Sequence, residues 1–203
     1  MSLARHLWDA NRDWAERILA HGFVRGLGDG SLPVASFRGY VAQDAYFLDA
    51  FARAYAFCLA NGTSRDNLYG FSELIAGVVE ELKLHKSYTE RLKIDLVRVT
   101  PIAATLAYVD FLLGTAQRGQ LGETIAAMTP CMRLYAFLGQ ALARTKVAPA
   151  YADWVKTYAD PSFEALAARL ETLLDVHASD SAAVRANYRR AMELEYRFFD
   201  ANC

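Results

Sequence analysis

The sequence predicts an all-α protein built as a helical bundle, and three observations carry this prediction. Apolar residues recur at the three- and four-residue spacing of a helix along most of the chain. No segment alternates apolar and polar residues between turn signals, as a half-buried strand would. The expected helices are long and the turns between them are short, which is typical of helical bundles.

The first half of the chain is expected to form three helices. Leu, Trp and Ile side chains at helical spacing predict the first helix, at residues 2–20. A glycine-rich turn at 26–30 leads to a helix at 34–59, which carries aromatic residues throughout. An Asn-Gly pair at 61–62 is expected to end it with a left-handed C-cap. Buried-side Leu, Ile and Val residues predict a helix, continuous or broken, at 65–97.

The second half of the chain is expected to form five helices. A Thr-Pro pair starts the helix at 101–117 and an Asp-Pro pair starts the one at 161–177. Each pair supplies an N-cap oxygen and then a proline at the first helical position. An apolar helix at 121–143 and a short helix at 149–158 lie between them, and the last helix is expected at 179–202.

The composition limits the class of protein. The 203 residues are 54% hydrophobic and 22% charged, so we expect one domain, residues 1–203, with a sizeable core. A net charge of −1 argues against nucleic-acid binding, which needs a basic face. Three separated cysteines form no disulfide framework, which fits a reduced, cytoplasmic setting. No signal peptide and no run of about 20 uncharged apolar residues is evident, so we expect no membrane span.

Cys131 is the candidate nucleophile, because cysteine is the strongest side-chain nucleophile near neutral pH. Tyr135, four residues on, lies on the same helix face. Pro130 could bend the helix and expose the thiol to a cavity. Residue statistics alone favour a buried structural cysteine, so the local pattern leaves both roles open.

Asp44 is the first of two candidate carboxylates. It shares a helix face with Phe47 and Phe51, and a carboxylate is costly to bury there unless it is paired or used. A solvated aspartate on the outer face of the helix is an equal alternative.

Glu195 is the second candidate carboxylate. Phe198 and Phe199 follow it at i+3 and i+4, and desolvation against aromatic rings would raise its pKa and make it a general acid. The alternative is a surface glutamate paired with Arg190 or Arg197.

Tyrosines on three expected helices could converge on one polar ligand. They are Tyr108, Tyr135 and Tyr158, and buried phenols seek hydrogen-bond partners. The chain has 11 tyrosines, so this pattern alone is a weak indication of a site.

Five motifs then occur in order along the chain. They are His-Gly-Phe-Val-Arg-Gly-Leu-Gly-Asp-Gly-Ser-Leu-Pro at 21–33, Gln-Asp-Ala-Tyr-Phe-Leu at 43–48, Pro-Cys-Met-Arg-Leu-Tyr-Ala-Phe-Leu-Gly at 130–139, Trp-Val-Lys-Thr-Tyr at 154–158 and Glu-Tyr-Arg-Phe-Phe at 195–199. Together they closely resemble the TenA family of thiaminase II proteins, over nearly the whole chain.

The resemblance implies a haem-oxygenase-like all-α fold that binds no haem or other cofactor and usually forms a homotetramer. It also implies a hydrolase of thiamin salvage. Family members convert aminopyrimidine breakdown products of thiamin to hydroxymethylpyrimidine and ammonia, and many also cleave thiamin. The expected partner is therefore a small molecule rather than a nucleic acid or a membrane.

The resemblance also implies roles for individual residues. Cys131 looks like the nucleophile of the cysteine-bearing subgroup, and Asp44 like the carboxylate that binds the pyrimidine amino group and ring nitrogen. Glu195 looks like the acid/base that exchanges a proton with the ring. We expect the Cys131 sulfur and the oxygens of Asp44 and Glu195 to line one enclosed cavity. The residues that resemble pocket aromatics are Phe47, Tyr108, Tyr135 and Tyr158.

Three residues depart from the family pattern. Gly22 stands where a proline commonly follows His21, which affects a loop. Arg133 stands where an aromatic residue often follows the cysteine, and Phe47 where a tyrosine is common. The changes at Arg133 and Phe47 leave the catalytic efficiency and the substrate open.

Two other functions stay open. A metal-dependent oxygenase would use Glu81 and His85, an i, i+4 pair, but the sequence has no second Glu-x-x-His unit of the kind found in di-iron bundles. A non-catalytic pyrimidine-binding regulator is the other alternative, although the sequence has no helix-turn-helix signal for direct DNA contact.

Overall fold

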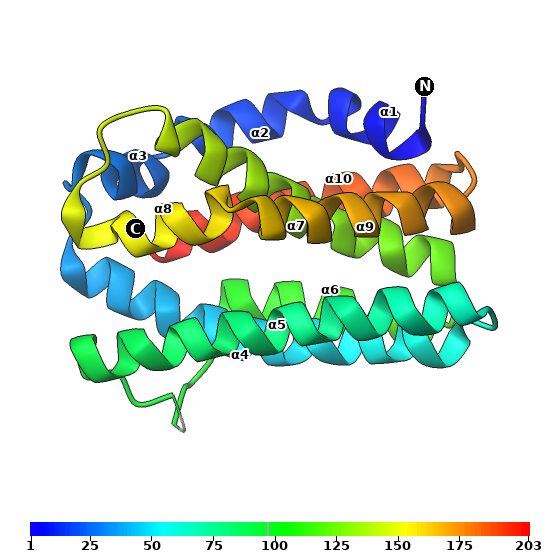
Figure 1. Cartoon of the computed structure of the whole chain (residues 1–203), viewed down its shortest axis with the longest axis horizontal. Helices are drawn as coiled ribbons and strands as arrows, with labels where there is room; N and C mark the ends of the chain where they lie inside the picture. Colours follow the sequence, from blue (N-terminus) through cyan, green and yellow to red (C-terminus); the bar gives the residue numbers. More distant parts are fainter. Residues whose placement is uncertain (97) are drawn as a thin grey trace.

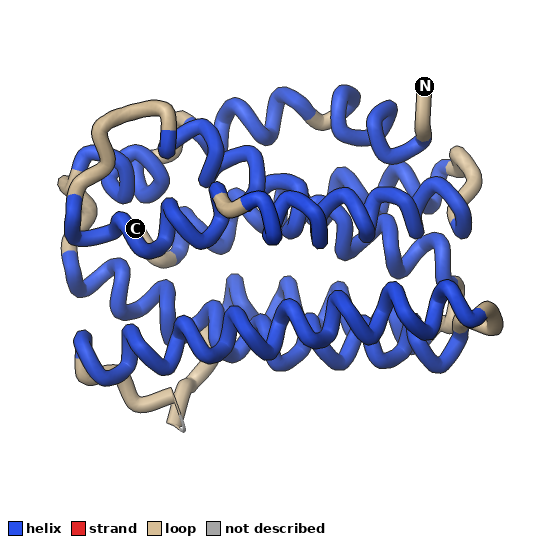
Figure 2. The backbone as a smooth tube through the Cα atoms, viewed as in Figure 1, coloured by secondary structure: helices blue, strands red, loops and turns tan. Residues whose placement is uncertain are grey.

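The expected all-α fold is confirmed by the computed structural model, which describes residues 1–96 and 98–203, without the side chains of 84–87 and 90. The described residues contain helices and turns but no strand (Figure 2). The helices are α1 (Leu3–Ala10), α2 (Arg12–Leu19), α3 (Gly22–Asp29), α4 (Val34–Asn61), α5 (Arg65–Leu92), α6 (Ala103–Gln117), α7 (Leu121–Ala143), η1 (Pro149–Tyr151), α8 (Ala152–Ala159), α9 (Pro161–His177) and α10 (Ala182–Ala201).

The long helices form two packed groups (Figure 1). Helix α4 packs against α5 and α6, while α7 packs against α8, α9 and α10. Helix α7 lies between the groups because it also contacts α4 and α6. Its buried residues surround the helix rather than forming one stripe, as expected for a central helix. None of the described helices combines the length and hydrophobicity needed to cross a bilayer.

The N-terminal region differs from the prediction of one helix at 2–20. The chain breaks at Asn11, whose side-chain Nδ2 donates to the Leu7 carbonyl at 2.8 Å and so ends α1. The predicted turn at 26–30 is also wrong, because these residues belong to α3 until Gly30 ends it at a φ of 84°. His21 caps α3 by accepting a hydrogen bond from the Phe23 backbone at 3.2 Å, without the proline common in the family.

The helix starts and ends depend on caps that the sequence shows only in part. The predicted start at Thr100-Pro101 is wrong, because α6 begins at Ala103. Gln43 of α4 holds this connection, since its Oε1 accepts from the Ile102 backbone at 3.0 Å. The left-handed cap at 61–62 is also wrong, because Gly62 has an extended φ of −80°.

Other predicted boundaries agree with the structure or move by a few residues. Asp160 caps α9 as predicted, with its Oδ1 2.8 Å from the Ser162 nitrogen. The short helix expected at 149–158 begins with a 3₁₀ turn before α8, and the last helix begins at Ala182 rather than at 179. Helix α5, which was expected at 65–97, ends at Leu92. Its expected end, Val97, lies outside the described residues.

Candidate active site

A small internal cavity lies where the two helical groups meet. The centre of a water-sized sphere has about 10 Å³ in which to move, which is room for about one water molecule. Its lining comes from α4, α5, α7, α8 and α9, and consists of Asp44, Phe47, Leu48, Phe51, Glu81, Cys131, Met132, Tyr135, Tyr158 and Phe163. Five of the residues proposed from sequence therefore meet here.

Helix α4 delivers Asp44 and Phe47 to the cavity because they lie three residues apart on one face. Asp44 is only 3% exposed, so the alternative of a solvated outer aspartate is wrong. The Phe47 ring packs on the Tyr108 ring, with centroids 4.6 Å apart. The α4 face thus places a carboxylate beside an aromatic wall.

Helix α7 delivers Cys131 and Tyr135, four residues apart, to the same cavity. The Tyr135 hydroxyl accepts a hydrogen bond from the Tyr40 hydroxyl at 3.2 Å. Tyr40 in turn accepts from Trp154 Nε1 at 3.2 Å. This chain fixes the Tyr135 phenol, and Tyr40 is a member that the sequence analysis did not identify.

Glu195 lies behind the cysteine rather than in the cavity lining. It is 1% exposed, and its Oε1 accepts a hydrogen bond from the Tyr108 hydroxyl at 2.8 Å. The carboxyl group also hydrogen-bonds the Cys131 thiol. The surface alternative for Glu195 is therefore wrong, and Arg190 pairs with Glu193 instead, at 3.1 Å.

Cys131 and Asp44 thus line one cavity, as expected, but Glu195 does not. Glu195 and Tyr108 are absent from the lining and reach the cavity only through contacts with Cys131 and Phe47. A sequence pattern identifies the helix face of a residue, but it does not distinguish a cavity wall from the layer behind it.

Burial controls the protonation of the cysteine and glutamate pair. Desolvation raises the pKa of Glu195 to about 8, although the hydrogen bonds from Tyr108 and Cys131 oppose the rise. Desolvation also raises the pKa of Cys131 well above its ordinary value, and the nearby Glu195, Glu81 and Asp44 carboxyls raise it further. At neutral pH the site therefore holds a neutral thiol beside a mostly protonated carboxylic acid.

Glu81 is a cavity residue that the sequence analysis considered only as a metal ligand. Its Oε1 accepts a hydrogen bond from the Tyr158 hydroxyl. Leu74, Val78 and Glu81 follow one another at i, i+4 and i+7, and this periodicity was the signal for its inward position. The side chain of His85 lies outside the described residues, and no group of three metal-ligating residues occurs among those described.

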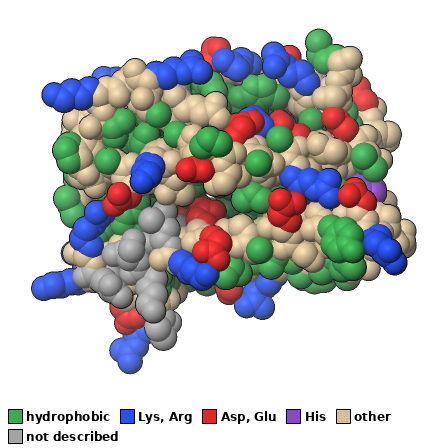
Figure 3. All heavy atoms as spheres, viewed as in Figure 1, with side chains coloured by type: hydrophobic (Ala, Val, Ile, Leu, Met, Phe, Trp, Pro, Cys, Tyr) green, Lys and Arg blue, Asp and Glu red, His purple; other side chains and the backbone are tan. Residues whose placement is uncertain are grey.

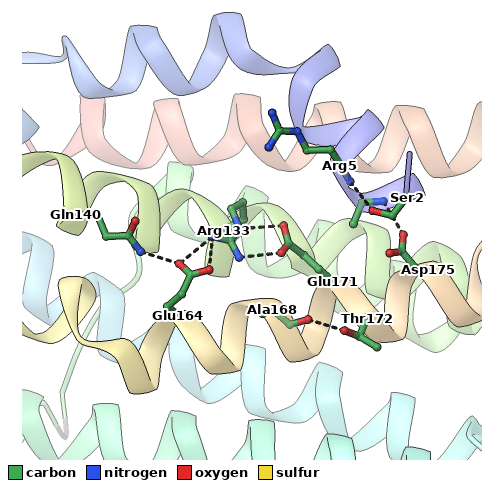
Figure 4. A network of polar contacts seen from close by, with 10 residues as sticks. Ser2, Arg5, Arg133, Gln140, Glu164, Ala168, Glu171, Thr172 and Asp175 are labelled. Atoms are coloured by element: carbon green, nitrogen blue, oxygen red, sulfur yellow. Dashed lines mark hydrogen bonds and ion pairs between the residues drawn. The ribbon is translucent and has the colours of Figure 1, made fainter.

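Arg133 is absent from the cavity lining and joins α7 to α9 through ion pairs (Figure 4). Its Nε and Nη2 atoms donate to the two Glu171 carboxylate oxygens at 2.9 and 2.8 Å, a bidentate pair. Its Nη1 atom donates to Glu164 at 2.9 Å, and Glu164 also accepts a hydrogen bond from Gln140 at 2.7 Å. Because Glu164 follows Phe163, these ion pairs hold the turn of α9 that covers the cavity.

A family model described as the TENA/THI-4/PQQC family matches residues 8–203. The aminopyrimidine aminohydrolase of Halalkalibacterium halodurans is 34% identical and aligns with 98% of this chain and 95% of its own length. The Bacillus subtilis protein of the same name is 28% identical over 98% of this chain and 89% of its own length. These relatives agree with the expected hydrolase of the thiaminase II type.

The fold also matches a solved structure. The crystal structure of a TenA family transcription regulator from a Silicibacter species aligns with a TM-score of 0.91 and 25% identity. The alignment covers 98% of this chain and 95% of that chain. The expected haem-oxygenase-like helical fold and the resemblance to TenA proteins are confirmed.

Proposed function

Because this chain belongs to the TENA/THI-4/PQQC family, we propose that it is an aminopyrimidine aminohydrolase of thiamin salvage. The substrate would be an aminopyrimidine breakdown product of thiamin, converted to hydroxymethylpyrimidine and ammonia, with thiamin as a further substrate. One observation carries this proposal: Cys131 and Asp44 line one internal cavity, and a buried glutamate hydrogen-bonds the thiol.

Asp44 would bind the edge of the pyrimidine. An ionised carboxylate accepts hydrogen bonds from an amino group and from a protonated ring nitrogen, and such charge-assisted bonds fix the position of a planar ligand. Phe47, Tyr135 and Tyr158 supply aromatic walls for the flat ring. The cavity holds about one water molecule, so the ring would enter only if side chains of the lining move aside.

Cys131 would add to an electron-poor carbon of the pyrimidine ring. As the new carbon–sulfur bond forms, the ring electrons move to a ring nitrogen, which takes a proton from Glu195. The thiol proton passes to Glu195, so the carboxyl group ends the step protonated, as it began. No free thiolate or carboxylate is required in the ground state, in agreement with the raised pKa values of both groups.

The amine would then leave from the exocyclic carbon and take the bonding electron pair with it as ammonia. The ring amino group supplies the electrons for this step, and an exocyclic methylene remains. Water adds to the methylene as a hydroxyl group and gives its other proton to the released ammonia. The ring-nitrogen proton then passes to Glu195 as Glu195 returns its own proton to the Cys131 sulfur. Loss of the Cys131 thiol restores the aromatic ring, so the net change is amine for hydroxyl.

Replacement of Cys131 by serine tests the proposal. Wild-type protein should release ammonia from 4-amino-5-aminomethyl-2-methylpyrimidine, and Cys131→Ser should lower kcat by at least about 100-fold while the pyrimidine still binds. Cys58→Ala is the matched control, because Cys58 is a buried cysteine of α4 outside the cavity. Wild-type turnover by Cys131→Ser would refute the nucleophile, while binding without ammonia release by the wild type would favour the regulator.

The family resemblance also supports a cytoplasmic homotetramer in which each chain forms one domain. Leu68 and Tyr69, which are 50% and 64% exposed, are apolar side chains that such an assembly would cover. Sedimentation equilibrium measures the oligomeric state directly, and a monomer at micromolar concentration would contradict the homotetramer.

A further inference from the structure

An open groove leads from the surface to the internal cavity. It has a volume of about 520 Å³ and lies between α5 and α9, where Figure 3 shows a hollow bordered by acidic side chains. Its lining is Glu73, Leu74, Gly77, Val78, Glu80, Glu81, Met132, Thr157, Ser162, Phe163, Ala165 and Leu166. Glu81, Met132 and Phe163 also line the internal cavity, so these three side chains form the boundary between the two spaces.

Glu81 is the ionisable residue at this boundary. It is half-buried, and the hydrogen bond from the buried Tyr158 hydroxyl holds its carboxyl group at the cavity wall. The other two carboxylates of the groove are exposed and form ion pairs, Glu80 with Lys83 at 2.6 Å and Glu73 with Arg169 at 3.9 Å. Among the described lining residues of the groove and cavity there is no Lys, Arg or His. A ligand that carries positive charge toward the groove would meet the Glu81 carboxyl group at the boundary with the cavity.

We propose that Glu81 binds the positively charged amine of the substrate, the group that leaves as ammonia. This assignment rests on the proposed function. Asp44 and Glu81 both line the cavity, but only Glu81 also lines the groove. A ring held by Asp44 would therefore direct its exocyclic aminomethyl group toward Glu81 and the exit. Glu81 thus determines specificity for an amine over an alcohol.

The substrate amine and the product alcohol differ in charge, so a contact with Glu81 would distinguish them. An aminomethyl group is an ammonium ion near neutral pH, whereas the hydroxymethyl group of the product is neutral. A carboxylate hydrogen-bonds the ammonium more strongly than the alcohol. Glu81 would therefore favour substrate entry, keep the amine protonated as a leaving group, and bind the product weakly.

Binding to two pyrimidines tests the assignment. Calorimetry would use Cys131→Ser protein, in which turnover should be at least about 100-fold slower, with 4-amino-5-aminomethyl-2-methylpyrimidine and its 5-hydroxymethyl analogue. Adding Glu81→Gln should weaken binding of the amine by about 10-fold or more and change binding of the alcohol by less than about 2-fold. Glu80→Gln is the control, since it removes the neighbouring charge outside the cavity.

The outcomes separate a binding role from a structural one. Equal losses for both pyrimidines, or no loss for the amine, would overturn the assignment. Glu81→Asp should recover part of the preference for the amine, which a purely structural role of the Tyr158 contact would not predict. Selective amine binding by a wild-type protein that releases no ammonia would refute the proposed function but support Glu81 as the amine site.

Discussion

Replacement of Glu195 by glutamine should change how the stability of the protein depends on pH. The wild-type carboxyl group is 1% exposed, and burial raises its pKa from an ordinary 4.5 to about 8. Below pH 4.5 the group is protonated in both the folded and the unfolded chain. Between 4.5 and 8 only the unfolded chain loses the proton, so the free energy of unfolding falls as pH rises, and above 8 the loss is complete.

The size of this effect follows from the pKa difference. One pKa unit corresponds to about 1.4 kcal/mol, so the rise from 4.5 to about 8 amounts to ~5 kcal/mol for this single group. Glutamine has nearly the same shape, cannot ionise, and can still accept the hydrogen bond from Tyr108. Glu195→Gln should therefore gain stability relative to wild type by up to ~5 kcal/mol between pH 4.5 and pH 9.

Urea unfolding of both proteins at one protein concentration, from pH 5 to pH 9, measures this difference. Glu193→Gln is the matched control, because Glu193 lies two residues earlier on α10 and forms a partly exposed ion pair with Arg190. The control should follow the wild-type pH dependence to within about 0.5 kcal/mol. If Glu195→Gln and wild type show parallel pH profiles, Glu195 does not carry a raised pKa and the proposed proton transfer loses its basis.

Two further substitutions test the packing around the site by urea unfolding. Arg133→Met leaves Glu164 and Glu171 without their partner and should cost about 2–4 kcal/mol, whereas Arg185→Met breaks an exposed pair and should cost less than about 1 kcal/mol. Equal losses would show that the Arg133 network is not stabilising. Gly139→Ala would place a Cβ in steric conflict with the Tyr158 backbone carbon and should cost about 1–3 kcal/mol and reduce ammonia release. Its control Gly114→Ala meets no atom within 4 Å and should stabilise the protein slightly.

The helices were largely predictable because their signals are local. The apolar segment at 121–143 matches α7, since helical periodicity and the turns that end helices are encoded within a few residues. The start of α6 was not predictable, because Gln43 of a distant helix holds that connection. The break at Asn11 depends on a side chain that bonds the carbonyl four residues before it, which periodicity does not reveal.

The sequence by itself determined the helical class, the family and the candidate chemical groups, Cys131, Asp44 and Glu195 among them. Only the tertiary structure decided how these groups meet. It placed Cys131 and Asp44 on the cavity, Glu195 behind the thiol, and Glu81 at the boundary with the groove. Periodicity assigns a side chain to a helix face, but its protonation and partners depend on which other helix packs against that face.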